Sequence, residues 1–165
     1  MSESLQLTYR PFKPEDVAPL TRIMKAAFDE DSRRHTDQAE GGPPGYDNGA
    51  FLRKWALNRA ASSFVVEIGG KAIGAFIVWI RPNRENILGN IFVDPALQDR
   101  GLGVAIWRWI EARYPDTRVW KTETPTFSKR NLHFYRDKCG FEVTGQDNSN
   151  DPPGGSTHFT KRMPG

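Results

Sequence analysis

Two closely spaced glycines, Gly101 and Gly103, are the first residues of this chain that suggest a chemistry. They lie in the stretch QDRGLGVAIW at 98–107, directly after a predicted strand over 85–95 and at the start of a predicted helix over 101–114. Glycine costs a helix about 1 kcal/mol relative to alanine, so two in one turn need a reason. The first N–H groups of a helix have no intrahelical acceptor, and the helix dipole adds about half a positive charge there. Glycines that let a phosphate approach this backbone closely would supply that reason.

A second stretch, NLHFYRDKCGF at 131–141, contains a tyrosine, whose hydroxyl is a side-chain group that can donate a proton. Tyr135 follows Asn131 by four residues on a short helix predicted over 128–141, so the two side chains share one helical face. Two familiar phosphate motifs are absent from the chain. The dinucleotide pattern GxGxxG would need a third glycine where Ile106 stands, and GxxxxGK[ST] does not occur.

The elements that must position these residues follow from hydrophobic periodicity. Helical spacing predicts one helix from Glu15 to Phe28 and another over 50–61. The polar stretch 29–49 is rich in Gly and Pro and predicts a long loop. The predicted strands are 5–12, a hairpin over 63–83 that turns at Gly69-Gly70, 85–95, 117–124, 141–145 and 156–163.

The order β-α-α-β-β-β-α-β-α-β-β predicts one α/β domain with a largely antiparallel sheet, over 5–163 after a short tail at 1–4. A strand–helix–strand unit at 87–123 should add one parallel pair with a right-handed crossover. With 165 residues, 38% hydrophobic and 26% charged, the chain is typical of one soluble globular domain.

Several classes of protein are disfavoured by simple features of the chain. The longest apolar run, 72–80, is too short to span a bilayer, and the N-terminus lacks the pattern of a secretory signal. A single cysteine, Cys139, excludes an internal disulfide. Three scattered histidines and one cysteine argue against a dedicated zinc site. We therefore expect a cytoplasmic protein.

The two motifs together resemble the signatures of the GNAT superfamily of N-acetyltransferases. QDRGLG at 98–103 matches the acetyl-CoA motif Q/R-x-x-G-x-G/A, and 131–141 resembles the second signature, N-x-x-x-[FY]-Y-x-x-x-G-F. The order of elements is similar to the GNAT fold over about 5–163. The resemblance implies a single-domain GNAT-type acyl-CoA N-acyltransferase fold, with a mixed, mostly antiparallel sheet flanked by helices. In that fold two parallel strands, here ending near Val93 and Glu123, splay apart around acetyl-CoA.

The resemblance also implies where coenzyme A and its acetyl group would lie. The pantetheine arm would pair with the open edge of the strand 87–93, and the pyrophosphate would meet the loop 98–104. The positive charge of 98–138, with nine basic against five acidic side chains, suits such a polyanion. The implied cofactor-binding residues are Ile91, Phe92, Val93, Gln98, Asp99, Arg100, Gly101, Leu102, Gly103, Val104, Asn131 and Tyr135.

By the same resemblance, Tyr135 is the catalytic residue that donates a proton to the leaving thiolate. Backbone N–H groups near Phe92 and Val93 would stabilise the oxyanion. Asn131 would bind the cofactor or acceptor, or alternatively be an N-cap or turn residue of its own helix. The general base stays open between Glu85, Glu123 and water, because Ile87 stands where many family members carry a glutamate.

The acceptor would be an amine of a small molecule or a peptide. The segment 29–49 carries six acidic side chains against two arginines, which favours a small cationic amine; solvation of a loop is the alternative explanation of these charges. The candidate acceptor-binding residues are Asp29, Glu30, Asp31, Glu85, Asn90 and Glu123.

Three other hypotheses compete with this one. A nonenzymatic acyl-CoA-binding or sensor domain could use the same fold. A nucleic-acid-binding module fits the pI of about 9.1, but the helix 101–114 lacks a continuous basic face. An acyl-enzyme on Cys139 lacks an evident histidine partner. We therefore predict an acetyl-CoA-dependent N-acetyltransferase that acts by direct transfer in a ternary complex, as a monomer or homodimer, without metal, nucleic acid or membrane.

Overall fold

One twisted sheet forms the centre of the molecule, and its strands follow the predicted order. The computed structural model describes residues 6–148, 150 and 152–164. Within them the sheet has seven strands in the order β1-β2-β3-β4-β5-β7-β6, and every neighbouring pair is antiparallel except β4 and β5. This confirms the predicted mixed, mostly antiparallel fold class. The strands are β1 (Leu7–Pro11), β2 (Ser62–Ile68), β3 (Lys71–Trp79), β4 (Glu85–Val93), β5 (Val119–Pro125), β6 (Glu142–Gln146) and β7 (Ser156–Arg162).

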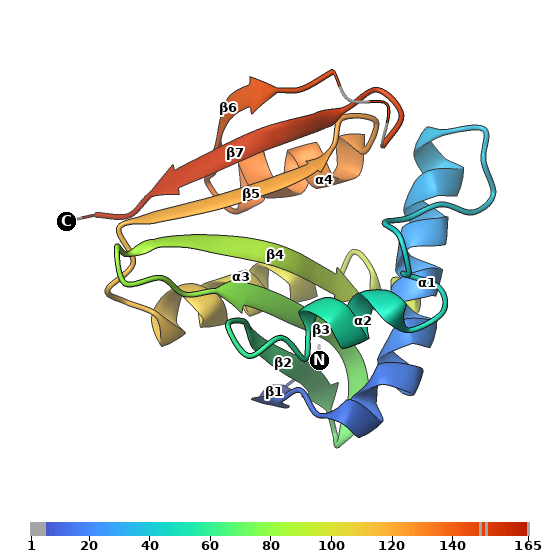
Figure 1. Ribbon diagram of the computed structural model, residues 1–165, viewed down its shortest axis with the longest axis horizontal. Coiled ribbons are helices and arrows are strands. Elements are labelled where there is room, and N and C mark those ends of the chain that lie inside the picture. Colours follow the sequence, from blue (N-terminus) through green and yellow to red (C-terminus); the bar gives the residue numbers. More distant parts are fainter. Residues whose placement is uncertain (1–5, 149, 151, 165) are drawn as a thin grey trace, which may run out of the picture.

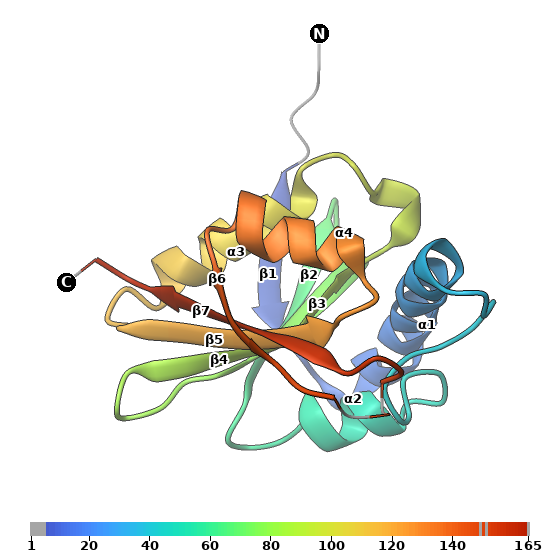
Figure 2. The same ribbon diagram turned by 90° about the horizontal axis from the view of Figure 1, so that it is seen from above.

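Helices cover both faces of the sheet (Figures 1 and 2). α1 (Val17–His35) and α2 (Ala50–Trp55) lie on one face, and α3 (Leu102–Arg113) and α4 (Lys129–His133) lie on the other. α4 continues directly into a π-helical turn, Phe134–Lys138. No helix of the described ranges is long and apolar enough to cross a membrane.

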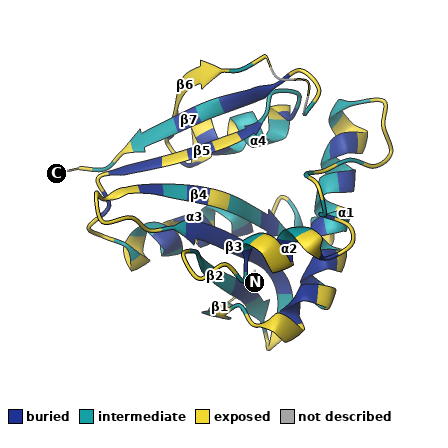
Figure 3. Ribbon diagram, viewed as in Figure 1, coloured by how far each residue is buried: buried dark blue, intermediate teal, exposed yellow. Residues whose placement is uncertain are grey.

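Two hydrophobic cores, one on each face, hold these helices in place. Under α3 and α4, side chains such as Ile106, Trp107 and Trp120 are almost completely buried. Under α1 and α2, the core contains residues such as Leu20 and Phe92. β3 is accordingly the most buried strand, with six successive buried residues, whereas β6 is exposed along its whole length (Figure 3). Removing this apolar surface from water is the main favourable term in such a fold, and it fixes where each helix lies.

α1 is longer than the periodicity predicted. The sequence predicts a helix that ends at Phe28, but the helix reaches His35, so the prediction of a loop from residue 29 was wrong. Ion pairs between residues three and four apart stabilise the extra turns: Glu30 contacts Arg33 at 2.7 Å and Arg34 at 2.9 Å. Charged helical turns of this kind show no apolar periodicity, which is why the pattern missed them.

The parallel strands β4 and β5 separate soon after they meet (Figure 1). They pair only over Glu85–Ile87 and Val119–Lys121. Between the pairs Val78–Leu88 and Ile77–Asn90 the register shifts by one residue, which is a β-bulge and bends β4. Just beyond the last pair, the Thr122 hydroxyl donates to the Leu88 carbonyl at 2.9 Å. The sheet therefore opens into a V towards the carboxyl ends of both strands.

Candidate functional site

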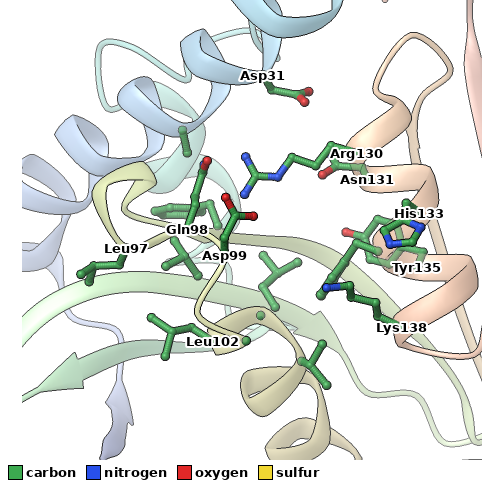
Figure 4. Close-up of a pocket in the computed structure, with 18 of the residues that line it drawn as sticks. Asp31, Leu97, Gln98, Asp99, Leu102, Arg130, Asn131, His133, Tyr135 and Lys138 are labelled. Carbon is green, nitrogen blue, oxygen red and sulfur yellow. The ribbon is translucent and has the colours of Figure 1, made fainter. Parts of the chain in front are cut away.

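A cavity of about 240 Å³ lies where the V opens, between β4, the loop that follows it, α1 and α4 (Figure 4). Eleven of the twelve residues implied as cofactor contacts line it, and Arg100 does not. Asp31 also lines it, as do several residues that the sequence analysis did not single out. These additional lining residues are Ala27, Phe28, Leu97, Arg130, His133, Phe134 and Lys138.

The loop 98–104 is built to receive an anion. Asp99 and Gly101 have positive φ values of 63° and 73°, which turn the chain sharply before α3. The first N–H group here with a backbone acceptor is that of Ala105, which donates to the Gly101 carbonyl at 3.1 Å. Within the described residues, the six N–H groups of 99–104 have no hydrogen-bond acceptor. Six free donors beside the positive end of a 12-residue helix are suited to bind a phosphate group.

The two glycines of this loop have different structural reasons. A Cβ on Gly101 would meet nothing within 4 Å, so space does not require glycine at this position. The left-handed backbone, which glycine adopts without steric cost, is the reason for it. A Cβ on Gly103 would lie 2.8 Å from a ring carbon of Phe134, so glycine serves there because α3 packs closely against the turn after α4. The sequence argument assigned both glycines to phosphate approach and missed this packing role.

The open edge of β4 presents alternate residues to the gap. The Asp94 N–H donates to the Ile73 carbonyl beside β3 at 2.7 Å. Because successive residues of a strand direct their backbone groups to opposite sides, Val93 and Ile91 direct theirs into the gap, whereas Phe92 directs its groups to β3. The backbone donors proposed at Phe92 and Val93 are therefore better placed at Ile91 and Val93. Phe92 lines the cavity and is 5% exposed.

Tyr135 lies on the α4 wall of the cavity, and a π-helical turn places it there (Figure 4). The second signature has three residues between its tyrosine and glycine, whereas four separate Tyr135 from Gly140. The turn absorbs the extra residue, because the Cys139 N–H donates to the Phe134 carbonyl at 2.9 Å, five residues back. Arg136, which falls at the tyrosine position of that signature, is exposed and does not line the cavity.

Burial keeps the Tyr135 hydroxyl protonated. The residue is 6% exposed, and its ring packs against Phe141 and Phe159 at centroid distances of 5.7 and 5.4 Å. This burial, followed by the charge of Cys139, raises the pKa of Tyr135 well above its ordinary value, against a smaller lowering effect of Thr122. A neutral phenol on a cavity wall can act as a proton donor over the whole physiological pH range.

Asn131 faces the cavity but does not cap its helix. Ser128 is the N-cap, since its hydroxyl oxygen accepts from the Asn131 N–H at 3.3 Å. The Asn131 side-chain amide donates to the Thr124 hydroxyl at 3.0 Å, which ties α4 to β5. The capping alternative for Asn131 was therefore wrong, and its amide oxygen stays available to a ligand in the cavity.

The three acidic residues predicted to face an acceptor have three different surroundings. Asp29 is 5% exposed and accepts from Lys25 at 2.6 Å, Tyr46 at 2.6 Å and the Gly41 N–H at 3.1 Å. Burial raises the pKa of Asp29, but these contacts outweigh it and hold the value below the ordinary one. Asp29 thus anchors the segment after α1.

The Glu30 carboxylate forms ion pairs with Arg33 and Arg34. Only Asp31 lines the cavity, where it accepts from the Ser128 hydroxyl at 2.8 Å.

The structure does not bring the two candidate carboxylate bases to the cavity wall. Glu85 lies at the closed end of the V, where β4 still pairs with β5. Glu123 is exposed and contacts Nδ1 of His158 at 3.4 Å, while Nε2 of the same ring contacts Asp147 at 3.0 Å. Asn90, at the bulge of β4, has a buried Oδ1 without a hydrogen-bond partner among the described residues, but it does not line the cavity.

Cys139 has the properties of a core residue. It is 4% exposed, and burial raises the pKa of its thiol to about 12. The reactive form of a cysteine is the thiolate, which such surroundings disfavour. This supports the sequence argument against an acyl-enzyme on Cys139.

Two cations that line the cavity, Arg130 and Lys138, were not identified from the sequence. They belong to the basic stretch 98–138, so the charge count indicated an anion site without showing which side chains face it. Residue spacing could not identify them, because a short helix followed by a π-helical turn does not keep the ordinary helical periodicity.

Comparison with known proteins agrees with this geometry. Residues 21–141 match the Acetyltransferase (GNAT) family. An uncharacterized protein of Bacillus subtilis (strain 168), YrkN, is 44% identical over 75 residues, which cover 45% of this chain and 40% of that relative. The match thus spans less than half of the relative's length.

Two solved structures share the fold over nearly their whole length. An acetyltransferase from Thermus thermophilus has a TM-score of 0.76 at 17% identity, covering 96% of this chain and 98% of its own. The PaiA N-acetyltransferase from Thermoplasma acidophilum, solved in complex with coenzyme A, has a TM-score of 0.74 at 13% identity, covering 96% and 99%. Together with the family match over most of the chain, these likenesses lead to one conclusion: the chain belongs to the acetyltransferase (GNAT) family.

Proposed function

We propose that this protein transfers an acetyl group from acetyl-CoA directly to an amine, in a ternary complex of enzyme, cofactor and acceptor. One observation carries the proposal: a single cavity joins the free N–H groups of 99–104 to the open edge of β4 and to Tyr135. A fold neighbour that is an N-acetyltransferase with coenzyme A bound supports the choice of cofactor and reaction.

The residues of the cavity fit coenzyme A in three places. The N–H groups of 99–104 would hold the pyrophosphate, since they are free donors at a helix N-terminus. Ile91 and Val93 would pair with the amides of the pantetheine arm, as a strand pairs with an open sheet edge. Tyr135 would lie by the sulfur. When bound, acetyl-CoA supplies a thioester whose acyl carbon can be attacked by an amine.

In this proposal Tyr135 gives its proton to the departing thiolate. A thiol has a pKa of ~8.5, so protonation by a neighbouring phenol helps the sulfur to leave at neutral pH. The N–H group of Ile91, whose carbonyl would take part in the pairing with pantetheine, would donate to the thioester carbonyl oxygen as it gains negative charge.

We assign removal of the acceptor's proton to water. A lysine-like amine has a pKa of about 10.4 and must lose a proton before it attacks. Glu85 and Glu123 lie away from the cavity lining, and the Asp31 carboxylate accepts from Ser128. Because two of these carboxylates lie outside the cavity and the third already accepts a hydrogen bond, solvent at the open end of the V is the simplest proton acceptor.

The acceptor that we propose is a cationic primary amine of a small molecule or a peptide. The argument from the acidic segment now rests on Asp31, because Asp29 is buried by its own partners and Glu30 is paired with arginines. A carboxylate in a partly enclosed cavity attracts an ammonium group more strongly than one in open water does.

The test is a turnover assay with acetyl-CoA over pooled amines and basic peptides, followed by thiol release and by the mass of the product. We expect one acceptor class to gain the mass of a single acetyl group, with calorimetry showing coenzyme A binding. If coenzyme A binds but no amine is acetylated at any concentration tried, the protein is a nonenzymatic acyl-CoA-binding domain. If coenzyme A does not bind, the whole proposal fails.

A further inference from the structure

Arg130 reaches across the cavity from the wall opposite the 99–104 loop. It lies in the first turn of α4, directly before Asn131, and lines the same cavity as the loop. Figure 4 shows its guanidinium extending from α4 towards Gln98 and Asp99, with Asp31 on the α1 side. The side chain thus extends from the α4 wall of the cavity towards the 99–104 loop.

Among the described residues this guanidinium has no ion pair, unlike other arginines of the molecule. Arg10, for example, contacts Asp16 at 2.7 Å, and Arg136 contacts Asp137 at 3.1 Å. Over the described part of the chain, no carboxylate oxygen lies within 4.0 Å of a nitrogen of Arg130, and the side chain donates no hydrogen bond. Arg130 is nevertheless half-buried.

Its surroundings make an anionic ligand favourable. Burial, followed by the charge of Arg34, lowers the pKa of Arg130, whereas Asp99 and Asp31 act in the opposite direction. A partly desolvated cation without a partner is costly, and a ligand that brings negative charge recovers that free energy. The five donors of a guanidinium form a planar fork that matches phosphate oxygens better than a lysine does.

We infer that Arg130 is a second clamp on the pyrophosphate of acetyl-CoA, closing on it from α4 while the N–H groups of 99–104 hold the opposite side. The inference rests on the proposed function, because it takes coenzyme A as the ligand. It also explains how the loop tolerates Asp99: the Arg130 guanidinium offsets a carboxylate that would repel a phosphate. The pyrophosphate is chosen over the 3′-phosphate because Arg130 extends towards the loop itself.

The experiment compares Arg130→Met with Arg136→Met, a matched control on the next turn that is exposed, paired and outside the cavity lining. Three ligands separate the phosphates: coenzyme A, dephospho-coenzyme A, which keeps the pyrophosphate, and pantetheine, which has neither. Affinities come from calorimetry for the first two and from ligand-observed NMR titration for pantetheine. Thermal melting of the free proteins checks folding.

We expect Arg130→Met to weaken coenzyme A and dephospho-coenzyme A alike, by roughly ten- to a hundredfold, as for loss of hydrogen bonds to a charged group. Pantetheine affinity and the melting temperature should not fall, and Arg136→Met should behave as wild type. Arg130→Lys, which keeps the charge and loses the fork, should recover part of the affinity.

Three results would overturn the assignment. An equal loss for pantetheine would make Arg130 a structural part of the cavity wall. A loss for coenzyme A alone would place Arg130 on the 3′-phosphate. Unchanged affinities for all three ligands would remove it from the site. If the wild-type protein itself does not bind coenzyme A, that result contradicts the proposed function and, with it, this inference.

Discussion

At the scale of single residues, the site depends on one buried phenol. Tyr135 is held among Phe134, Phe141 and Phe159, and the pKa of its hydroxyl is raised by that burial. The same burial that makes it a good core residue therefore keeps it in the form that can donate a proton. The packing role and the proposed catalytic role fall on the same side chain, and a substitution that keeps the ring separates them.

Replacing Tyr135 with Phe keeps the ring packing and removes the proton donor. We expect kcat for the best amine to fall by roughly 10²-fold, with little change in coenzyme A affinity. Steady-state kinetics and calorimetry give the two numbers. Wild-type turnover in this variant, once the chemical step is known to limit the rate, would assign Tyr135 to packing alone.

The pH profile distinguishes water from a carboxylate as the base. If the acceptor loses its proton to solvent, kcat/KM should rise about tenfold per pH unit until it levels near the acceptor's own pKa, about 10 for an alkylamine. Tyr135 acts in its protonated form, and its pKa is raised, so no loss from its ionisation is expected below that point. A plateau that begins near a pH of about 6 or 7 would instead indicate a protein base.

At the scale of secondary structure elements, the start of α3 has two glycines within three residues, and each meets a different structural requirement. Gly101 supplies a left-handed turn beside free N–H groups, and Gly103 supplies the close contact with Phe134. One glycine therefore belongs to the ligand site and the other to the packing of α3 on the π-helical turn that carries Tyr135. The two roles predict different responses to the same small substitution.

Gly101→Ala should weaken coenzyme A binding more than it lowers stability. The left-handed backbone costs a non-glycine residue about 1–2 kcal/mol, and the loop relieves that strain by leaving its binding conformation. Gly103→Ala should lower stability first, because its Cβ would lie 2.8 Å from the Phe134 ring.

Calorimetry and chemical denaturation of both variants measure these two responses. Phe134→Leu combined with Gly103→Ala should recover part of the lost stability, since the two sites are in contact. If Gly101→Ala leaves coenzyme A affinity unchanged, the loop is not the phosphate site.

At the scale of the whole molecule, the sheet has the form of two arms that are joined at one end (Figure 1). β4 and β5 pair at one end only, and at the open end the Ser128 hydroxyl before α4 donates to the Asp31 carboxylate of α1. The two hydrophobic cores hold the arms from opposite faces. A ligand that pairs with β4 and touches α4 would add the contacts that the open end lacks.

Coenzyme A should therefore raise the melting temperature of the protein. A ligand at a hundred times its Kd adds about 2.7 kcal/mol of stability, which corresponds to several degrees for a domain of this size. Tyr135→Phe should show the same rise, because it removes no phosphate contact. Differential scanning calorimetry over a concentration series measures the effect, and a melting temperature independent of coenzyme A would contradict it.

The sequence by itself determined the features that depend on neighbouring residues. The order of elements, the parallel pair and the glycine loop before α3 are local signals, since turns, caps and periodicity each involve a few consecutive positions. The loop at 98–104 was found in this way, and Tyr135 was found because its stretch resembles the family's second signature; Tyr135 and most of the loop line the cavity.

Only the tertiary structure decided which side chains share a surface. Asp29 and Asp31 look alike in the sequence, yet one is buried by Tyr46 and the other lines the cavity beside Ser128, 97 residues away in the chain. Arg130 became a candidate phosphate ligand because the carboxylates that act on it, such as Asp99 and Asp31, lie on other elements and form no ion pair with it. Burial, charge pairing and the close approach of Gly103 to Phe134 depend on distances between distant segments, which no local pattern contains.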